Sequence, residues 1–167
     1  MAVTSSPRAT LTLPTDEQIL ITLEFDAPKH LVYKAWTTPE LVKRWWHAKR
    51  GEVTVVESDL RVGGAWRSVM VAEGGFEVGF HGEYQEIVPN ERIVSTEIYE
   101  GLPEGVSEEE GATVNTVTFT EADGRTTVTL LIQATSKTSR DAIIASGMED
   151  GLQDALDLLE QVAISLR

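Results

Sequence analysis

The sequence contains no cysteine, which excludes three kinds of site. The chain forms no disulfide bond, no thiolate zinc site and no covalent intermediate on a cysteine. Its stability therefore has to come from an apolar core, and 167 residues are enough for one domain that buries roughly two-thirds of its unfolded surface. The absence of cysteine also fits a reducing compartment.

Basic residues are scarce, which argues against nucleic acid as a partner. The chain has 14 lysines and arginines against 27 aspartates and glutamates, and its net charge is −13. Such a protein repels phosphate backbones. Eight of the 14 basic residues nevertheless lie between Lys29 and Arg67. This uneven distribution predicts either solvated faces of opposite sign or a basic rim that attracts an anionic ligand or partner.

Long apolar runs are also absent. No segment approaches the ~20 apolar residues of a membrane span, and residues 1–15 lack the apolar stretch of a secretory signal. We therefore expect a cytoplasmic protein without membrane contact. Residues 1–15 mix serine, threonine and proline, which predicts a disordered tail before a single domain over residues 16–167.

Patterns for metals, cofactors and nucleophilic catalysis are missing. His30, His47 and His81 lack the spacing of metal ligands. No serine stands in a nucleophile elbow, and neither glycine pair of the first 80 residues is followed by the lysine and helix of a phosphate-binding loop. We expect neither a metal nor a cofactor.

The hydrophobic periodicity predicts a chain of mixed helices and strands. Alternating and branched residues indicate strands over residues 19–25, 52–58, 65–71, 76–88, 91–99, 113–120 and 126–133. Proline starts and helical spacing indicate short helices over residues 30–36 and 40–46, and an apolar stripe indicates a long helix over residues 139–166. Residues 100–111 carry glycines, a proline and glutamates, which predicts a mobile loop.

The order of these elements predicts an α+β helix-grip fold. Short turns between consecutive strands, such as Ala122-Asp123-Gly124, favour antiparallel pairing. The expected architecture is a curved antiparallel sheet of six to seven strands, wrapped around the long C-terminal helix, with two short helices after the first strand. A strongly curved sheet closed by one helix leaves space for a ligand.

Five motifs resemble a known family. They are Trp36 to Leu41, Trp45-Trp46, Asp59 to Gly64 with Trp66, Gly82 to Tyr84 with Ile87, Pro89 and Glu91 to Ile93, and Gly147 to Gly151. In this order they resemble the bacterial branch of the activator-of-heat-shock-chaperone-ATPase homologue family. That family belongs to the START-like superfamily, also called SRPBCC or birch-pollen-allergen-like. The resemblance covers residues 19–166.

The resemblance implies a helix-grip fold and a ligand class. Members of the family include carriers and sequestering proteins for hydrophobic compounds and some self-resistance proteins, and more distant relatives are aromatase/cyclases. The eukaryotic namesake stimulates a chaperone ATPase, which would connect the chain with stress response. Three positions depart from the family pattern: His47-Ala48 replaces Gly-Pro, Val62 replaces a proline, and Leu152 replaces a tryptophan over the expected cavity.

Apolar side chains of the strands and helices are the expected walls of a ligand cavity. The candidates are Trp36, Trp45, Trp46, Trp66, Met70, Phe80, Tyr84, Tyr99, Val117, Phe119, Ile144, Met148, Gly151 and Leu152. The tryptophans have an alternative role as core anchors. Because neighbours on a helix differ by about 100°, one of Trp45 and Trp46 has to point away from the core. Gly147 and Gly151 either allow close packing of the helix or leave room for the ligand.

Strand alternation selects two weak catalytic candidates. Asn115 shares its face with Val117 and Phe119, and Glu97 shares its face with Ile93 and Tyr99. An inward Glu97 would have a raised pKa and could act as a general acid or base, whereas an outward Glu97 would simply be solvated. In the preceding strand Phe76, Val78, Phe80 and Tyr84 are expected inward, and His81, Glu83 and Gln85 outward.

Three functions are consistent with these observations. The first is binding of a small hydrophobic or aromatic molecule for transport, sequestration or sensing. The second is an enzyme of cyclase or aromatase type, which needs a buried titratable group. The third is a co-chaperone that contacts a chaperone through its surface. The sequence favours binding over catalysis, and a monomer or weak dimer is expected.

Overall fold

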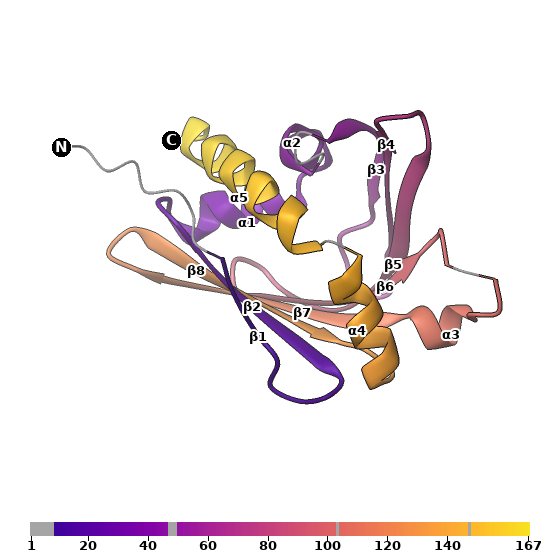
Figure 1. The fold of residues 1–167 in the computed structure, drawn as a ribbon. Coiled ribbons are helices and arrows are strands. Elements are labelled where there is room, and N and C mark those ends of the chain that lie inside the picture. Colours follow the sequence, from indigo (N-terminus) through magenta and orange to yellow (C-terminus); the bar gives the residue numbers. More distant parts are fainter. Residues whose placement is uncertain (1–8, 47–49, 103, 147) are drawn as a thin grey trace.

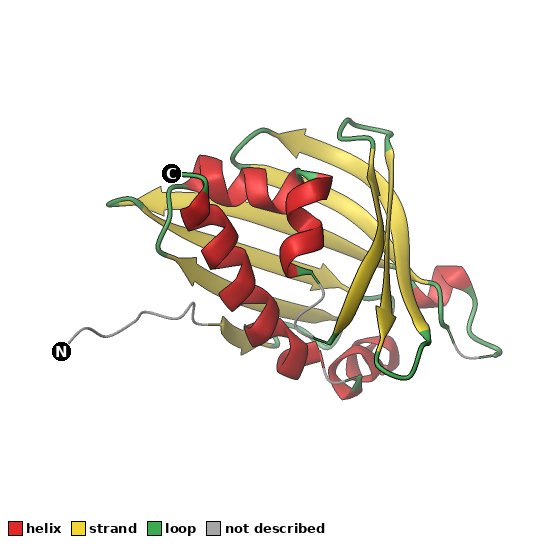
Figure 2. Ribbon diagram, turned by 90° about the horizontal axis from the view of Figure 1, so that it is seen from above, coloured by secondary structure: helices red, strands yellow, loops and turns green. Residues whose placement is uncertain are grey.

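The computed structural model describes residues 9–46, 50–102, 104–146 and 148–167, and for residues 148–151 only the backbone. Figures 1 and 2 show a curved antiparallel sheet with helices on its concave face. In chain order the elements are β1 (Ala9–Thr12), β2 (Gln18–Phe25), α1 (Lys29–Thr37), α2 (Pro39–Trp45), β3 (Gly51–Ser58), β4 (Ala65–Ala72), β5 (Glu77–Val88), β6 (Arg92–Tyr99), α3 (Glu108–Gly111), β7 (Thr113–Ala122), β8 (Arg125–Gln133), α4 (Lys137–Ala145) and α5 (Met148–Ser165).

The strands from β3 to β8 form an antiparallel meander, and the first long strand, β2, pairs with the last strand, β8. The order of the sheet is β1-β2-β8-β7-β6-β5-β4-β3, and every neighbouring pair is antiparallel. The hairpin between β7 and β8 turns through Asp123 (φ 54°) and Gly124 (φ 76°), both in the left-handed region that a tight two-residue turn requires. The predicted α+β class and antiparallel meander are confirmed.

The sheet has eight strands, one more than the largest number predicted. The additional strand is β1, which lies inside the segment expected to be a disordered tail. It pairs with β2 from Ala9 opposite Leu23 to Thr12 opposite Leu20. Thr10 and Thr12 favour a strand, but four residues between Pro7 and Pro14 form too short a pattern to predict one. The pairing provides hydrogen-bond partners for the backbone groups along the free edge of β2, and Leu11 packs against the core.

The C-terminal helix is divided, whereas one continuous helix was predicted. α4 begins at Lys137 behind Ser136, whose Oγ accepts a hydrogen bond from the amide of Ser139 (3.1 Å). It ends at Ser146, and α5 then runs in a different direction (Figure 1). The apolar stripe keeps its spacing across the break, so periodicity alone does not reveal it. Gly147, expected at this place, lies outside the described residues.

Two smaller differences concern loops. The segment 100–111 contains a short helix, α3, whose N-cap Ser107 accepts a hydrogen bond from the amide of Glu110 (3.2 Å). Phe76, expected on the inner face, is 64% exposed. The reason is that pairing between β4 and β5 ends with Val71 opposite Glu77, so Phe76 lies in the turn beyond the last paired residues.

One end of the concave face carries the core. Ile19, Ile21, Leu23 and Phe25 alternate along β2, and each is fully buried. They belong to one cluster with side chains of α1, α2, β6, β7, β8 and α5. The helix α5 contributes Leu156, Leu159, Val162 and Ala163. Burying each such aliphatic side chain contributes about 1.5–3 kcal/mol.

The two phenylalanines at positions 25 and 76 test this arrangement. We expect Phe25→Ala to lower the free energy of unfolding by about 3–5 kcal/mol, because it empties a fully buried site. Phe76→Ala deletes the same atoms from an exposed turn and should change it by less than about 0.5 kcal/mol. Urea unfolding followed by tryptophan fluorescence measures both, and equal losses would contradict the described core.

Candidate ligand-binding site

One of the four tryptophans, Trp45, is buried in the core, and the half-buried Trp36 packs against it. Trp36 and Trp45 lie with ring centroids 5.6 Å apart, and Trp36 also contacts Phe119 edge-on at 5.9 Å. The indole N–H of Trp45 donates to the carbonyl of Ala35 (2.9 Å), so this buried ring has its polar atom satisfied. These rings anchor α1 and α2 on the sheet.

Trp46 points in another direction from its neighbour Trp45. Its ring meets Phe80 edge-on at 6.0 Å, and Phe80 lies 5.2 Å from Tyr99. Register explains the second contact, because Phe80 on β5 is opposite Tyr99 on β6. We call Trp46, Phe80 and Tyr99 the aromatic row. Trp46 and Phe80 are half-buried and Tyr99 is 38% exposed, so the row keeps accessible apolar surface.

Trp66 and Tyr84 are held beside the aromatic row. The indole N–H of Trp66 donates to the carbonyl of Thr96 (3.2 Å), across Gly82. A Cβ atom at Gly82 would lie 1.8 Å from that carbonyl oxygen and 2.8 Å from the indole nitrogen, so only glycine permits this close approach. The hydroxyl of Tyr84 hydrogen-bonds Ser58 (2.7 Å), and burial raises the pKa of Tyr84.

Glu97 and Asn115, the two catalytic candidates, meet on adjacent strands. The register of β6 and β7 places Ser95 opposite Asn115 and Glu97 opposite Thr113, all on the face that carries Ile93 and Val117. The amide of Asn115 donates to Oε2 of Glu97 (3.0 Å), and the hydroxyl of Thr113 donates to the amide oxygen of Asn115 (3.1 Å). Burial raises the pKa of Glu97 to about 7, and the hydrogen bond from Asn115 offsets part of this effect.

Glu100 shows the opposite environment on the convex face. Arg67 donates two hydrogen bonds to its carboxylate (2.9 Å each), and Nδ1 of His81 lies 2.9 Å from it. The hydrogen bonds from Arg67 lower the pKa of Glu100 to about 2. The pKa values of Glu97 and Glu100 thus shift in opposite directions, because Glu97 is desolvated and Glu100 has a cationic partner.

The remaining cavity candidates lie in different surroundings. Met70 is half-buried on β4, and Ile144 and Leu152 approach the core from α4 and α5. Val117 and Phe119 are 5% and 2% exposed and belong to the packed core, which leaves them little surface for a ligand. The side chains at Met148 and Gly151, and the departure at His47-Ala48, lie outside the described residues.

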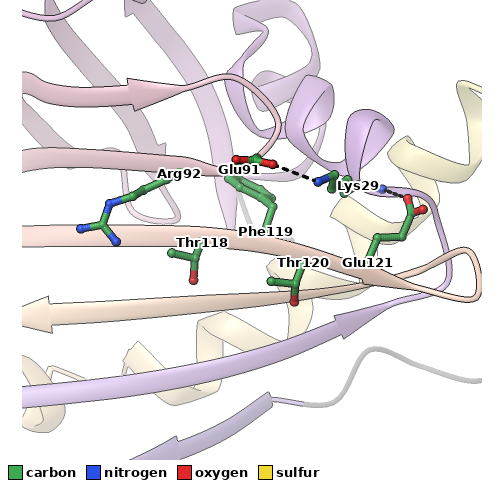
Figure 3. Close-up of a pocket in the computed structure, with 7 residues that line it drawn as sticks. All are labelled: Lys29, Glu91, Arg92, Thr118, Phe119, Thr120 and Glu121. Carbon is green, nitrogen blue, oxygen red and sulfur yellow. Dashed lines mark hydrogen bonds and ion pairs between the residues drawn. The ribbon is translucent and has the colours of Figure 1, made fainter.

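A hollow of about 500 Å³ opens at the surface between α1 and the strands β6 and β7 (Figure 3). Its lining is Lys29, Glu91, Arg92, Thr118, Phe119, Thr120 and Glu121. Nζ of Lys29 pairs with Glu91 (3.6 Å), and the backbone amide of Lys29 donates to Glu121 (2.7 Å). Sequence patterns do not reveal this hollow, because its residues come from three segments about 25 to 90 positions apart. Lys29 already pairs with Glu91, and Arg92 pairs with Glu86 outside the hollow, so this charged lining offers little to an apolar ligand.

The described part of the chain has neither a metal-type cluster nor a membrane-spanning helix. None of its histidine, aspartate and glutamate side chains gather in a group of three or more that could hold a metal ion. None of the helices described here is long and apolar enough to cross a membrane.

The raised pKa of Glu97 predicts a specific pH dependence of stability. A carboxyl group with a pKa near 4.5 when unfolded and about 7 when folded disfavours folding once it is ionised. Its contribution is therefore most favourable below about pH 4.5 and is lost as the pH rises toward 7, by up to about 3 kcal/mol. Glu97→Gln is neutral throughout and should not show this loss. Urea unfolding between pH 5 and pH 8, with Glu83→Gln as the exposed control, tests this. Parallel pH curves for wild type and Glu97→Gln would contradict it.

Comparison with known proteins identifies the family. The model of the Activator of Hsp90 ATPase homolog 1-like protein family matches residues 26–163. A search of curated proteins found no significant match.

Solved structures share the fold over nearly the whole chain. A Rhodobacter sphaeroides protein has a TM-score of 0.85 at 21% identity and covers 95% of this chain and 99% of its own. A Chromobacterium violaceum protein has a TM-score of 0.71 at 26% identity, covering 87% and 96%. CalU16 from Micromonospora echinospora has a TM-score of 0.60 at 21% identity, covering 96% and 93%. With its eight-stranded sheet closed by C-terminal helices, the chain belongs to the Activator of Hsp90 ATPase homolog 1-like family.

Proposed function

We propose that this chain binds a small hydrophobic or aromatic molecule between the concave face of its sheet and the C-terminal helices, as a carrier, a sequestering protein or a sensor. The observation that supports this most directly is the aromatic row. Phe80 contacts both Trp46 and Tyr99, and each of the three rings keeps accessible surface. The neighbouring Trp45 is buried in the core, and the half-buried Trp36 packs against it.

Exposed apolar area would drive the binding of such a molecule. Removing apolar surface from water contributes about 25 cal/mol for each Å². Rings that the protein itself leaves partly exposed therefore provide a driving force for an apolar ligand that covers them. Flat aromatic ligands suit such rings especially well, because edge-to-face and offset contacts add about 0.5–1.5 kcal/mol per pair.

Polar groups next to the aromatic row would orient such a ligand. Ligand sites are mostly apolar and contain a few placed polar groups that provide specificity. Glu97 and Asn115 lie on the same face of β6 and β7, and Tyr99 follows Glu97 on that face of β6. A ligand against the aromatic row would thus have hydrogen-bonding groups within reach.

Catalysis is the second candidate function, and the pair of Glu97 and Asn115 favours it. A carboxyl group with a pKa of about 7 is suited to general acid or base catalysis at neutral pH. Mass spectrometry distinguishes the two functions, because a carrier releases its ligand unchanged and an enzyme of cyclase or aromatase type changes its mass. Co-chaperone activity, which the family name suggests, stays a prediction.

Binding can be tested with N-phenyl-1-naphthylamine, a neutral probe that becomes fluorescent in apolar surroundings. We expect saturable binding to the wild type and an affinity at least about ten-fold lower for Phe80→Ala, which removes the centre of the aromatic row. Phe76→Ala removes the same ring from the exposed turn and should bind as the wild type does.

Native mass spectrometry of freshly purified protein complements the probe. A bound molecule would appear as a defined increase in mass that unfolding releases. Absence of saturable probe binding, or equal affinities of both alanine variants and the wild type, would overturn the proposed site.

A further inference from the structure

Glu97 is a carboxylate on the face of β6 that carries the proposed site. Among the described residues, every fully enclosed side-chain nitrogen and oxygen has a hydrogen-bond partner. Asn115 holds Oε2 of Glu97, and no described residue forms a hydrogen bond with Oε1. Glu97 keeps part of its surface exposed and lies on the concave face of β6, so a ligand on that side can approach Oε1.

The charge of the Glu97 carboxylate is not balanced by a described residue. None of the ion pairs among the described residues includes Glu97, whereas Glu100 on the other face is held by Arg67 and His81. Arg140, a buried arginine of α4, donates instead to Asp141 and to the carbonyl of Thr15. A desolvated carboxylate without a cation is costly, and a ligand that brings a positive charge removes this cost.

Aromatic rings lie on the same face of the sheet as the Glu97 carboxylate. Tyr99 lies two residues after Glu97 on the same face of β6, and Phe80 is opposite Tyr99. Trp66 lies across Gly82, next to Phe80 in the adjoining strands. The faces of aromatic rings carry negative electrostatic potential and attract cations within about 6 Å of the ring centroid. Carboxylate and rings therefore favour the same kind of ligand group.

These observations point to one ligand class. We propose that the bound molecule is an apolar or aromatic amine, whose protonated nitrogen pairs with Oε1 of Glu97 while its apolar body covers the aromatic row. The ammonium group supplies the hydrogen-bond donors that Oε1 lacks, and Asn115 and Thr113 keep the carboxylate in place. The net charge of −13 adds a general attraction for cations. This inference rests on the proposed binding function and specifies its ligand.

The test uses two probes that differ only in the polar group, 2-naphthylmethylamine and 2-naphthalenemethanol. Both compete with N-phenyl-1-naphthylamine at pH 8, where the amine remains largely protonated. We expect the wild type to bind the amine at least about ten-fold more tightly than the alcohol. Glu97→Gln should abolish this preference, so that the variant binds the amine and the alcohol with affinities within about three-fold of each other.

Two further variants separate the site from general electrostatics and from misfolding. Glu83→Gln removes the same charge from the exposed outer side of β5 and should keep the preference for the amine. Asn115→Ala leaves the carboxylate but removes its hydrogen bond, and should reduce the preference without abolishing it. Circular dichroism confirms that each variant is folded before binding is measured.

The outcomes distinguish the two proposals. If both probes bind but the alcohol binds as tightly as the amine, the amine inference is wrong and the proposed function stands. A preference that survives in Glu97→Gln also overturns the inference, because another group then recognises the amine. If neither probe displaces N-phenyl-1-naphthylamine and that probe itself does not bind, the proposed function fails and the amine inference fails with it.

Discussion

Every second side chain of β2, from Ile19 to Phe25, is fully buried beneath the helices, and this contact determines how the rest of the chain is placed. The covering side chains come from α5 and from the short helices α1 and α2. Because α5 packs over this end of the sheet, α1 and α2 have to lie beside it (Figure 1). The end of α2 then reaches across to β5, where Trp46 meets Phe80.

The position of the helices divides the concave face into two regions. Near β2 and β8 the side chains fill the space between sheet and helices, and Val128 and Leu159 are fully buried. Near β4, β5 and β6 the inner side chains keep accessible surface, and the aromatic row lies there. A close-packed core and the proposed ligand site can coexist in one small fold because the curved sheet is covered more completely at one end than at the other.

The two glutamates of β6 and its end illustrate how strand geometry assigns chemistry. Glu97 and Glu100 are three positions apart, so they lie on opposite faces of the sheet. The convex face supplies Arg67 and His81 to Glu100, while on the concave face Asn115 is the one described residue that donates a hydrogen bond to the Glu97 carboxylate. One carboxylate is thereby paired with a cation within the protein, and the other has no cationic partner among the described residues. This difference is the basis of the ligand charge that we propose for the concave face.

The sequence by itself determined what local geometry controls: the alternation that put Glu97 on one face with Ile93 and Asn115 on one face with Val117, and the helical angle that separated Trp45 from Trp46. It also carried the family motifs and the antiparallel order of the strands. Long-range contacts decided the rest. Only the register of β6 and β7 brought Asn115 to Glu97, only packing chose Trp45 for the core, and only the free edge of β2 made a strand of Ala9–Thr12. These outcomes depend on partners distant in the chain, and short-range periodicity holds no information about them.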